Sequence, residues 1–340
     1  MTNTKKSIFY LAYLILSSVA LILCIEGLGR LAIHMRHGIP GKSYGLWKYD
    51  PELGAVHRPN AYNTRTSLNN YGFRNQEDVY DPKPVNSLRI IAFGGSTTFG
   101  YNLTDSETYT EKLELKLRQI PGYEKTQVLN AGSICYSAGH NFILMKRLVP
   151  LLRPDYAILY EGVNEPMNAW ALRKDGVLPD KLEDTYGIIG KSFDQNRWLK
   201  RNSVIVRFVD YYVKSRLPSF QPNAVAQSHQ IHPWVLENYK YLLRHMIDFL
   251  KEQNSTPVIL RYASLGQPEQ EIFSNVSAEI AKEKGVLVCD MASRFRERDG
   301  KAKDLFSDTG VHVTPEGAEI LADELFQMIL QDLKNRNPSR

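Results

Sequence analysis

The sequence predicts an α/β fold of three layers, in which a parallel sheet lies between two layers of helices. Short apolar runs alternate along the chain with longer segments whose apolar residues recur at helical spacing. Such alternation is typical of parallel strands joined by right-handed helical crossovers. A chain of 340 residues has room for one large domain of this kind together with additional segments.

Five apolar runs are the expected strands, because each is short and is bounded by turn residues: residues 88–93, 127–130, 156–160, 257–261 and 285–289. Four segments with apolar residues at helical spacing are the expected helices: residues 110–120, 141–152, 234–253 and 315–333. Since helices separate the strands, we expect one five-stranded parallel sheet.

Residues 166–232 interrupt this alternation after the third strand. The stretch contains Trp170, Trp198 and many basic residues, and its pattern predicts a short helix over residues 204–213. An insertion at this point is a candidate lid or substrate wall. A plain surface elaboration, or a segment resting on a membrane, is the equally open alternative.

The N-terminal segment predicts one transmembrane helix. Residues 7–25 carry no charge, and nineteen residues at ~1.5 Å each nearly cross a ~30 Å hydrocarbon core. Two lysines precede the segment and no small-residue cleavage site follows it, which favours an uncleaved anchor over a signal peptide. We expect a cytoplasmic tail (1–6), an anchor (7–26), a juxtamembrane region of turns and short extended pieces (27–86), and the α/β domain (87–335).

Composition excludes several classes of protein. The chain is 43% hydrophobic and 23% charged, as in globular proteins, and its net charge of +5 is scattered rather than gathered in basic blocks. Nucleic-acid binding is therefore not expected. Three cysteines rule out a disulfide framework, although Cys135 and Cys289 could still form one bridge. No cluster of cysteines and histidines suggests a metal site.

The end of the first strand carries a candidate nucleophile. The strand runs into Gly94, Gly95 and Ser96, and the glycines permit a sharp turn. Open α/β sheets bind their ligands at the carboxyl ends of their strands, which is where Ser96 stands. A tight turn without catalytic function is the alternative, so the assignment depends on residues elsewhere in the chain.

Two further groups of conspicuous residues occur later in the chain. Gly162, Val163 and Asn164 follow the third strand, and Asp308 and His312 precede the last helix. Together with Ser96, these blocks resemble the SGNH (GDSL-like) hydrolase superfamily, especially its membrane-anchored bacterial members, over roughly residues 50–335. The resemblance implies a flavodoxin-like domain that hydrolyses esters with no metal or organic cofactor.

The resemblance also implies a role for each residue of the site. Ser96 would be the nucleophile, His312 its base and Asp308 the carboxylate that orients the histidine. The oxyanion hole would consist of the backbone N–H of Ser96, the backbone N–H of residue 135 and the side chain of Asn164.

The chain departs from the family pattern at two of these positions. Three residues separate Asp308 from His312 where the family has two. A one-residue bulge could still bring Asp308 to the histidine, Asp304 could substitute for it, or Ser96 and His312 could work with a weaker third member. Cys135 stands where the family has the oxyanion glycine. A negative φ there would preserve the hole, whereas a positive φ would reduce activity. Glu165 replaces an aspartate whose role is structural.

One more motif precedes the nucleophile. Residues 69–74 resemble an Asn-x-x-Gly-Phe-Arg signature that is common before the nucleophile block in membrane-anchored relatives. Arg74 could contact substrate or could simply be an arginine that stabilises a turn.

Three functions follow from these observations. The first is a membrane-anchored esterase, at the cell membrane with its catalytic domain outside the cytoplasm, that removes O-acyl groups from an envelope or extracellular glycan. The acyl group is expected to be acetyl, and the partners are an acylated small molecule or glycan and the membrane. The second is an O-acyltransferase that uses the same site, and the third is a non-catalytic glycan-binding or assembly module. The sequence predicts no oligomeric state.

Overall fold

The structure, a computed structural model, describes residues 3–37, 43–165, 203–206, 208–209, 212, 231, 233–262, 268–297, 302–308 and 310–336. Its contacts divide the chain into two compact units. The first contains Met1–Gly45 and Asp194–Gln227, and the second contains Leu46–Phe193 and Ser228–Arg340. The second unit thus begins before residue 87, where we expected the α/β domain to start. Most of the insertion predicted at 166–232 lies outside the described residues, so its role stays a prediction.

Helix α1 (Asn3–His37) carries the candidate membrane span of the first unit. The span covers Ile8–Ala32, 25 residues of which none is buried. At ~1.5 Å per residue it is about 37 Å long, enough to cross a hydrocarbon core of ~30 Å. It overlaps the anchor predicted at residues 7–26. Length and composition make this helix a candidate for either an anchor or a signal sequence.

A second helical segment of the first unit contacts α1 at Glu26. Residues 204–206, 208–209 and 212 are helical, in line with the helix predicted there. The carboxylate of Glu26 accepts hydrogen bonds from the backbone N–H groups of Val204 (2.9 Å) and Ile205 (3.2 Å). These are N–H groups of a first helical turn, which have no partner within the helix, so Glu26 satisfies them.

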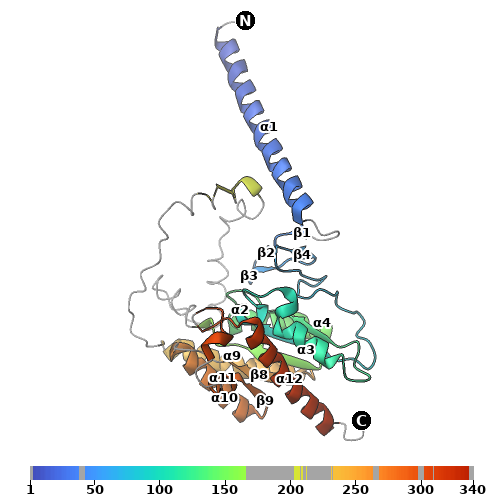
Figure 1. The fold of residues 1–340 in the computed structure, drawn as a ribbon. Helices are drawn as coiled ribbons and strands as arrows, with labels where there is room; N and C mark the ends of the chain where they lie inside the picture. Colours follow the sequence, from blue (N-terminus) through green and yellow to red (C-terminus); the bar gives the residue numbers. More distant parts are fainter. Residues whose placement is uncertain are drawn as a thin grey trace. The chain divides into compact units, whose positions relative to one another are not determined.

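The second unit is built on a five-stranded parallel sheet (Figure 1). Its strands are β5 (Arg89–Gly94), β6 (Gln127–Asn130), β7 (Tyr156–Tyr160), β8 (Thr256–Arg261) and β9 (Leu287–Asp290). The order is β6-β5-β7-β8-β9, and Ile91 of β5 pairs with Leu129 on one side and Ala157 on the other. This is the flavodoxin-like order, and it confirms the predicted sheet.

Helices cover both faces of the sheet. The longer ones are α3 (Tyr109–Leu117), α4 (Ala138–Leu152), α9 (Pro233–Glu252), α10 (Pro268–Lys284) and α12 (Pro315–Arg336). The shorter ones are α2 (Ser96–Phe99), α11 (Met291–Arg296) and the 3-10 turns η1 (Asp105–Glu107) and η3 (Ala302–Leu305). Four of the longer helices were predicted, whereas α10 was not.

The alternation of side chains along β5 separates two cores. Ile90 and Ala92 pack with α3 and α12, whereas Ile91 and Phe93 pack with α4, α9 and α10. Successive residues of a strand point to opposite faces, so an unbroken apolar run is what a strand buried on both faces requires. The three-layer α/β/α arrangement is therefore confirmed.

Short strands and turns precede the sheet, as predicted for this region: β1 (Ser43–Tyr44), β2 (Trp47–Asp50), β3 (Gly54–His57) and β4 (Ala61–Tyr62).

The segment after these strands covers one edge of the sheet, where Asn75 lies on the free edge of β6. Its side chain donates to the carbonyl of Val128 (2.9 Å) and accepts from the N–H of Asn130 (2.9 Å). The segment thus covers an edge that would otherwise expose unpaired backbone groups.

Candidate active site

The turn after β5 presents Ser96 at the carboxyl edge of the sheet. A Cβ atom at Gly95 would lie 2.3 Å from Nδ2 of Asn164 and 3.1 Å from the carbonyl oxygen of Tyr136, so only glycine fits here. Ser96, 8% exposed, begins the single turn of α2. It stands beside β7, at the switch point where ligands of doubly wound sheets bind.

Residues that follow β6 hold α2 in place. A Cβ atom at Gly132 would lie 2.3 Å from the backbone nitrogen of Phe99, so α2 packs directly on the glycine backbone. The side chain of Asn130 donates to the carbonyl of Thr98 (2.8 Å) and to Thr110 Oγ1 (3.0 Å). The backbone that carries Ser96 is therefore fixed by two neighbouring segments.

The structure brings Ser96, His312 and Asp308 together in one hydrogen-bonded chain. Nε2 of His312 lies 2.8 Å from Oγ of Ser96, and Nδ1 of His312 contacts Oδ2 of Asp308. A carboxylate only accepts hydrogen bonds, so Nδ1 carries the ring proton and Nε2 presents a lone pair to the serine hydroxyl. This is the arrangement in which a histidine can act as a base toward a serine.

A hairpin accommodates the additional residue between Asp308 and His312. The N–H of Ser307 donates to the carbonyl of His312 (2.7 Å), and that of Thr314 donates to Leu305 (2.9 Å). Within the turn, Oδ1 of Asp308 accepts from the N–H groups of Val311 (3.0 Å) and His312 (3.1 Å). The turn of the hairpin takes up the insertion, so the carboxylate still reaches the ring.

Hydrogen bonding also favours the ionised form of Asp308. Burial raises the pKa of this carboxyl, but the hydrogen bonds from His312 and from the backbone N–H of Val311 outweigh it and leave the pKa below its usual value. Asp304, the alternative carboxylate, lies on η3, where its backbone carbonyl accepts from the hydroxyl of Thr314 (3.3 Å). Asp308 and not Asp304 is thus the carboxylate at His312.

Asn164 joins the loops that follow β5, β6 and β7. Its buried Nδ2 donates to the carbonyl of Tyr136 (2.7 Å) and lies directly against Gly95. Gly95 precedes Ser96 and Tyr136 follows Cys135. The three positions predicted for the oxyanion hole therefore converge around the amide of Asn164.

Cys135 adopts the conformation that glycine favours. Its φ is +66°, and it occupies a turn closed by the N–H of Tyr136 on the carbonyl of Ser133 (3.1 Å). This is the case in which we expected a non-glycine residue to reduce activity, because a side chain at positive φ is strained. The thiol is free, as is that of Cys289, and burial raises its pKa, which disfavours the thiolate nucleophile.

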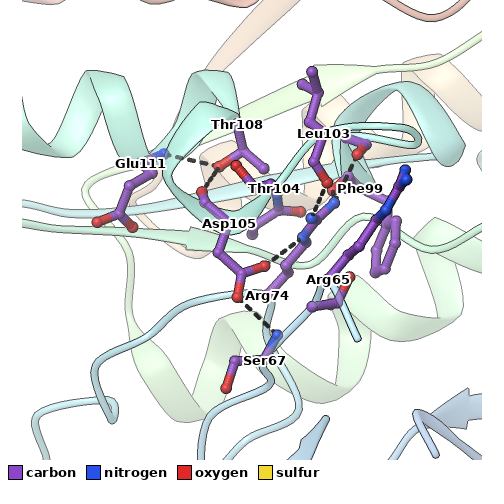
Figure 2. A network of polar contacts seen from close by, with 12 residues as sticks. Arg65, Ser67, Arg74, Phe99, Leu103, Thr104, Asp105, Thr108 and Glu111 are labelled. Carbon is purple, nitrogen blue, oxygen red and sulfur yellow. Dashed lines mark hydrogen bonds and ion pairs between the residues drawn. The ribbon is translucent and has the colours of Figure 1, made fainter. Parts of the chain in front are cut away.

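Arg74 is buried, and its guanidinium is held by backbone carbonyls around α2 and by one carboxylate (Figure 2). It donates to the carbonyls of Phe99 (2.7 Å), Gly100 (2.7 Å) and Leu103 (2.6 Å), and it pairs with Asp105 (2.9 Å). Its guanidinium also lies 4.7 Å from the ring centroid of Phe99. Of the two roles predicted for this arginine, the geometry fits the structural one.

Tyr101 also reaches the site, and the sequence analysis did not single it out. Its ring centroid lies 4.9 Å from that of His312 at an interplanar angle of 47°. The signal in the sequence was weak: an aromatic residue directly after the glycine that ends α2. Only the fold brings residues 101 and 312 together.

Two buried carboxyl groups lie behind the site. Burial, together with the neighbouring charge of Glu165, raises the pKa of Glu161 well above its usual value. Burial also raises the pKa of Glu165, although Oε1 of Glu165 accepts from the N–H of Ala138 (2.7 Å) at the start of α4. Asn141 donates to Glu161 (3.1 Å). Glu165 therefore binds the backbone at the start of α4, which is the structural role expected at this position.

Two other histidines, His140 and His245, have different surroundings. His140 is buried and stacks on Tyr136, with ring centroids 4.9 Å apart, and burial lowers its pKa to about 4. His245 lies against Tyr241 on α9. His229 and His232 lie outside the described residues. Within the described residues, no group of three or more His, Cys, Asp or Glu side chains is placed to hold a metal ion.

Comparison with known proteins identifies the class. The model of the GDSL-like Lipase/Acylhydrolase family matches residues 92–320, well over half of the chain. The chain therefore belongs to this family, whose members are ester hydrolases. A search of curated proteins finds no match.

The chain is also similar, at low identity, to several solved structures. A putative lipolytic protein of the G-D-S-L family from Desulfitobacterium hafniense is 14% identical, over 71% of this chain and 99% of that chain, with a TM-score of 0.44. A lipase/acylhydrolase from Enterococcus faecalis is 15% identical (71% and 95%, TM-score 0.46). The acetyl xylan esterase AlAXEase is 15% identical (71% and 98%, TM-score 0.45).

Proposed function

We propose that this ester hydrolase is a membrane-anchored serine esterase that removes acyl groups, with acetyl as the first candidate, from hydroxyl groups of an envelope or extracellular glycan. The observation that carries the proposal is the hydrogen-bonded chain from Ser96 through His312 to Asp308. A glycan suits an enzyme tethered at the cell surface.

The first half of the reaction transfers the acyl group to the enzyme. Nε2 of His312 takes the hydroxyl proton of Ser96 while Oγ attacks the ester carbonyl. The carbonyl oxygen becomes an oxyanion. As it collapses, the bond to the alcohol breaks, and the alcohol oxygen leaves with the proton from Nε2.

The second half releases the acyl group. Water gives a proton to His312 and attacks the acyl-serine carbonyl, the acyl–Oγ bond breaks, and Ser96 recovers its proton from Nε2. Asp308 stabilises the charged imidazole in both halves without taking its proton.

The oxyanion would be held by the backbone N–H groups of Ser96 and Cys135 and by the amide of Asn164. The Asn164 amide carries two protons, and the carbonyl of Tyr136 accepts one, so the other remains for the substrate. Donors fixed before the reaction stabilise developing charge without reorganising.

Activity of the full chain in detergent tests the catalytic part. We expect acetate release from ethyl acetate or an acetylated sugar, and loss of that release by at least about 10³-fold in Ser96→Ala and in His312→Ala. Wild-type protein that is folded but inactive on every ester would contradict an esterase. Acetyl transfer to an added sugar, at the expense of free acetate, would indicate the O-acyltransferase instead.

The anchor proposal is tested separately. We expect the full chain to stay in the membrane fraction after alkaline carbonate washing, with the hydrolase unit cleaved by protease added outside the cytoplasmic membrane. A processed, soluble protein would identify α1 as a signal sequence, and protection from the protease would place the catalytic unit in the cytoplasm.

A further inference from the structure

Tyr101 is an exposed aromatic residue next to the histidine of the site. It is 45% exposed although its ring lies against the imidazole of His312. A partly exposed aromatic ring keeps apolar surface on which another molecule can pack. The ring is therefore available to whatever molecule reaches His312.

The backbone that carries this ring is held close to both the nucleophile and the base. The backbone N–H of Tyr101 donates to the carbonyl of Ser96 (3.0 Å). Next along the chain, Asn102 donates to Oγ of Ser307 (3.4 Å), and that hydroxyl donates to the carbonyl of His312 (3.1 Å). The backbone of Tyr101 therefore cannot move away from the site without breaking these hydrogen bonds.

The reaction determines which part of an ester lies beside this ring. His312 must give its proton to the oxygen of the departing alcohol, so that oxygen lies within hydrogen-bond reach of Nε2. The acyl carbonyl, in contrast, faces the region of Asn164. The alcohol part of the substrate is consequently the part that approaches Tyr101.

We propose that Tyr101 is a substrate-contacting residue that binds the alcohol part of the ester, and that this part is a sugar ring stacked on the tyrosine. The inference rests on the proposed esterase function. One face of a pyranose presents C–H groups that pack on an aromatic ring, while the sugar hydroxyls remain hydrated at the rim. The polar side chains of Asn102 and Ser307, both exposed, flank this position and suit hydroxyl groups better than a lipid chain.

The test compares two acetyl esters that differ only in their alcohol: a monoacetylated methyl glucoside and ethyl acetate. For the full chain in detergent, we expect Tyr101→Ala to lower kcat/KM for the sugar ester about tenfold more than for ethyl acetate. Tyr101→Phe keeps the ring and should retain the wild-type ratio of the two values.

Tyr241 supplies a matched control. It is 41% exposed and also lies against a histidine, His245, with ring centroids 3.9 Å apart, but it belongs to the surface of α9. Tyr241→Ala should leave both kcat/KM values unchanged. An equal loss on both esters in Tyr101→Ala would reduce Tyr101 to a support for His312 and overturn the proposal, as would no loss on either.

A binding measurement separates this proposal from the esterase proposal. In the Ser96→Ala background, NMR titration with the acetylated glucoside should show affinity that Tyr101→Ala lowers about tenfold. If the wild type hydrolyses neither ester but this difference in binding is present, the esterase function fails and the sugar subsite stands. Equal binding with and without Tyr101 would overturn the subsite.

Discussion

Asp308 contacts His312 twice, through the ring and through the backbone. Oδ2 meets Nδ1 of the imidazole, while Oδ1 accepts the backbone N–H of the same histidine at 3.1 Å. One carboxylate thus fixes both the position of the hairpin and the orientation of the ring it carries. The family's shorter spacing is therefore not required for a carboxylate to orient the base.

Replacing Asp308 by Asn tests this relationship. An amide in place of the carboxylate can donate to Nδ1, which would move the ring proton to Nε2 and leave no lone pair for Ser96. We expect kcat to fall by about 10²–10⁴ in Asp308→Asn with little change in melting temperature. The measurement is steady-state acetate release.

Asp304→Asn is the matched control, because Asp304 lies four residues earlier and its hydrogen bond to Thr314 uses only the backbone carbonyl. We expect its kcat to stay within about threefold of wild type, as for most surface substitutions. If Asp308→Asn kept full activity, Ser96 and His312 would be acting without a third member.

The backbone conformation at Cys135 leads us to expect that a glycine there stabilises the protein. Cys135 holds φ at +66°, a conformation that costs a non-glycine residue roughly 1 kcal/mol or more. We expect Cys135→Gly to raise the melting temperature and to keep or raise kcat, because the backbone N–H is retained. Differential scanning calorimetry and the acetyl-ester assay measure the two effects.

Cys135→Ala separates backbone strain from loss of the thiol, since alanine removes the sulfur but keeps Cβ. The strain argument requires the glycine variant to be more stable than the alanine variant. The opposite order would mean that the thiol itself stabilises the turn.

We expect replacement of Arg74 to lower the stability of the fold strongly. Without its guanidinium, three carbonyls around α2 and the carboxylate of Asp105 would lose their donors in a buried site (Figure 2). We expect Arg74→Met to destabilise the fold by about 3–5 kcal/mol in denaturant unfolding. Arg74→Lys should recover little of this, because an ammonium cannot reproduce the forked geometry.

The exposed Arg65, which also appears in Figure 2, is the control for Arg74. Arg65→Met should change the free energy of unfolding by less than about 0.5 kcal/mol. Wild-type stability in Arg74→Lys would show that a single positive charge is sufficient.

The sequence predicted the sheet better than it predicted the site. Strands β5 and β7 are buried along their whole length, so the apolar runs at their centres stand out from the neighbouring segments. Helix α10 was missed because most of its residues are polar, and its buried face rests on a few residues such as Phe273 and Ile280. Local patterns identify an element when burial is extensive.

The site depends on contacts between distant parts of the chain. The blocks around Ser96 and His312 could be recognised, but the contact of Tyr101 with His312 spans more than two hundred residues and leaves no local pattern. The φ of Cys135 likewise depends on the turn that Ser133 and Tyr136 close. Residue types suggest roles, whereas tertiary contacts determine which neighbours support them.

The buried Glu161 predicts how stability changes with pH. Its pKa is raised in the folded state, so the folded protein holds a proton that the unfolded chain releases above its ordinary pKa of 4.5. The contribution of this proton to the free energy of unfolding is then complete below pH 4.5, and it is lost as the pH rises toward the raised pKa. Glu161→Gln, which is neutral at every pH, should melt at a higher temperature than wild type at pH 8 and at nearly the same temperature at pH 4.5. Glu279→Gln, at an exposed position of α10, should follow the wild-type curve. Parallel melting curves for Glu161→Gln and wild type across this range would mean that folding does not raise the pKa of Glu161.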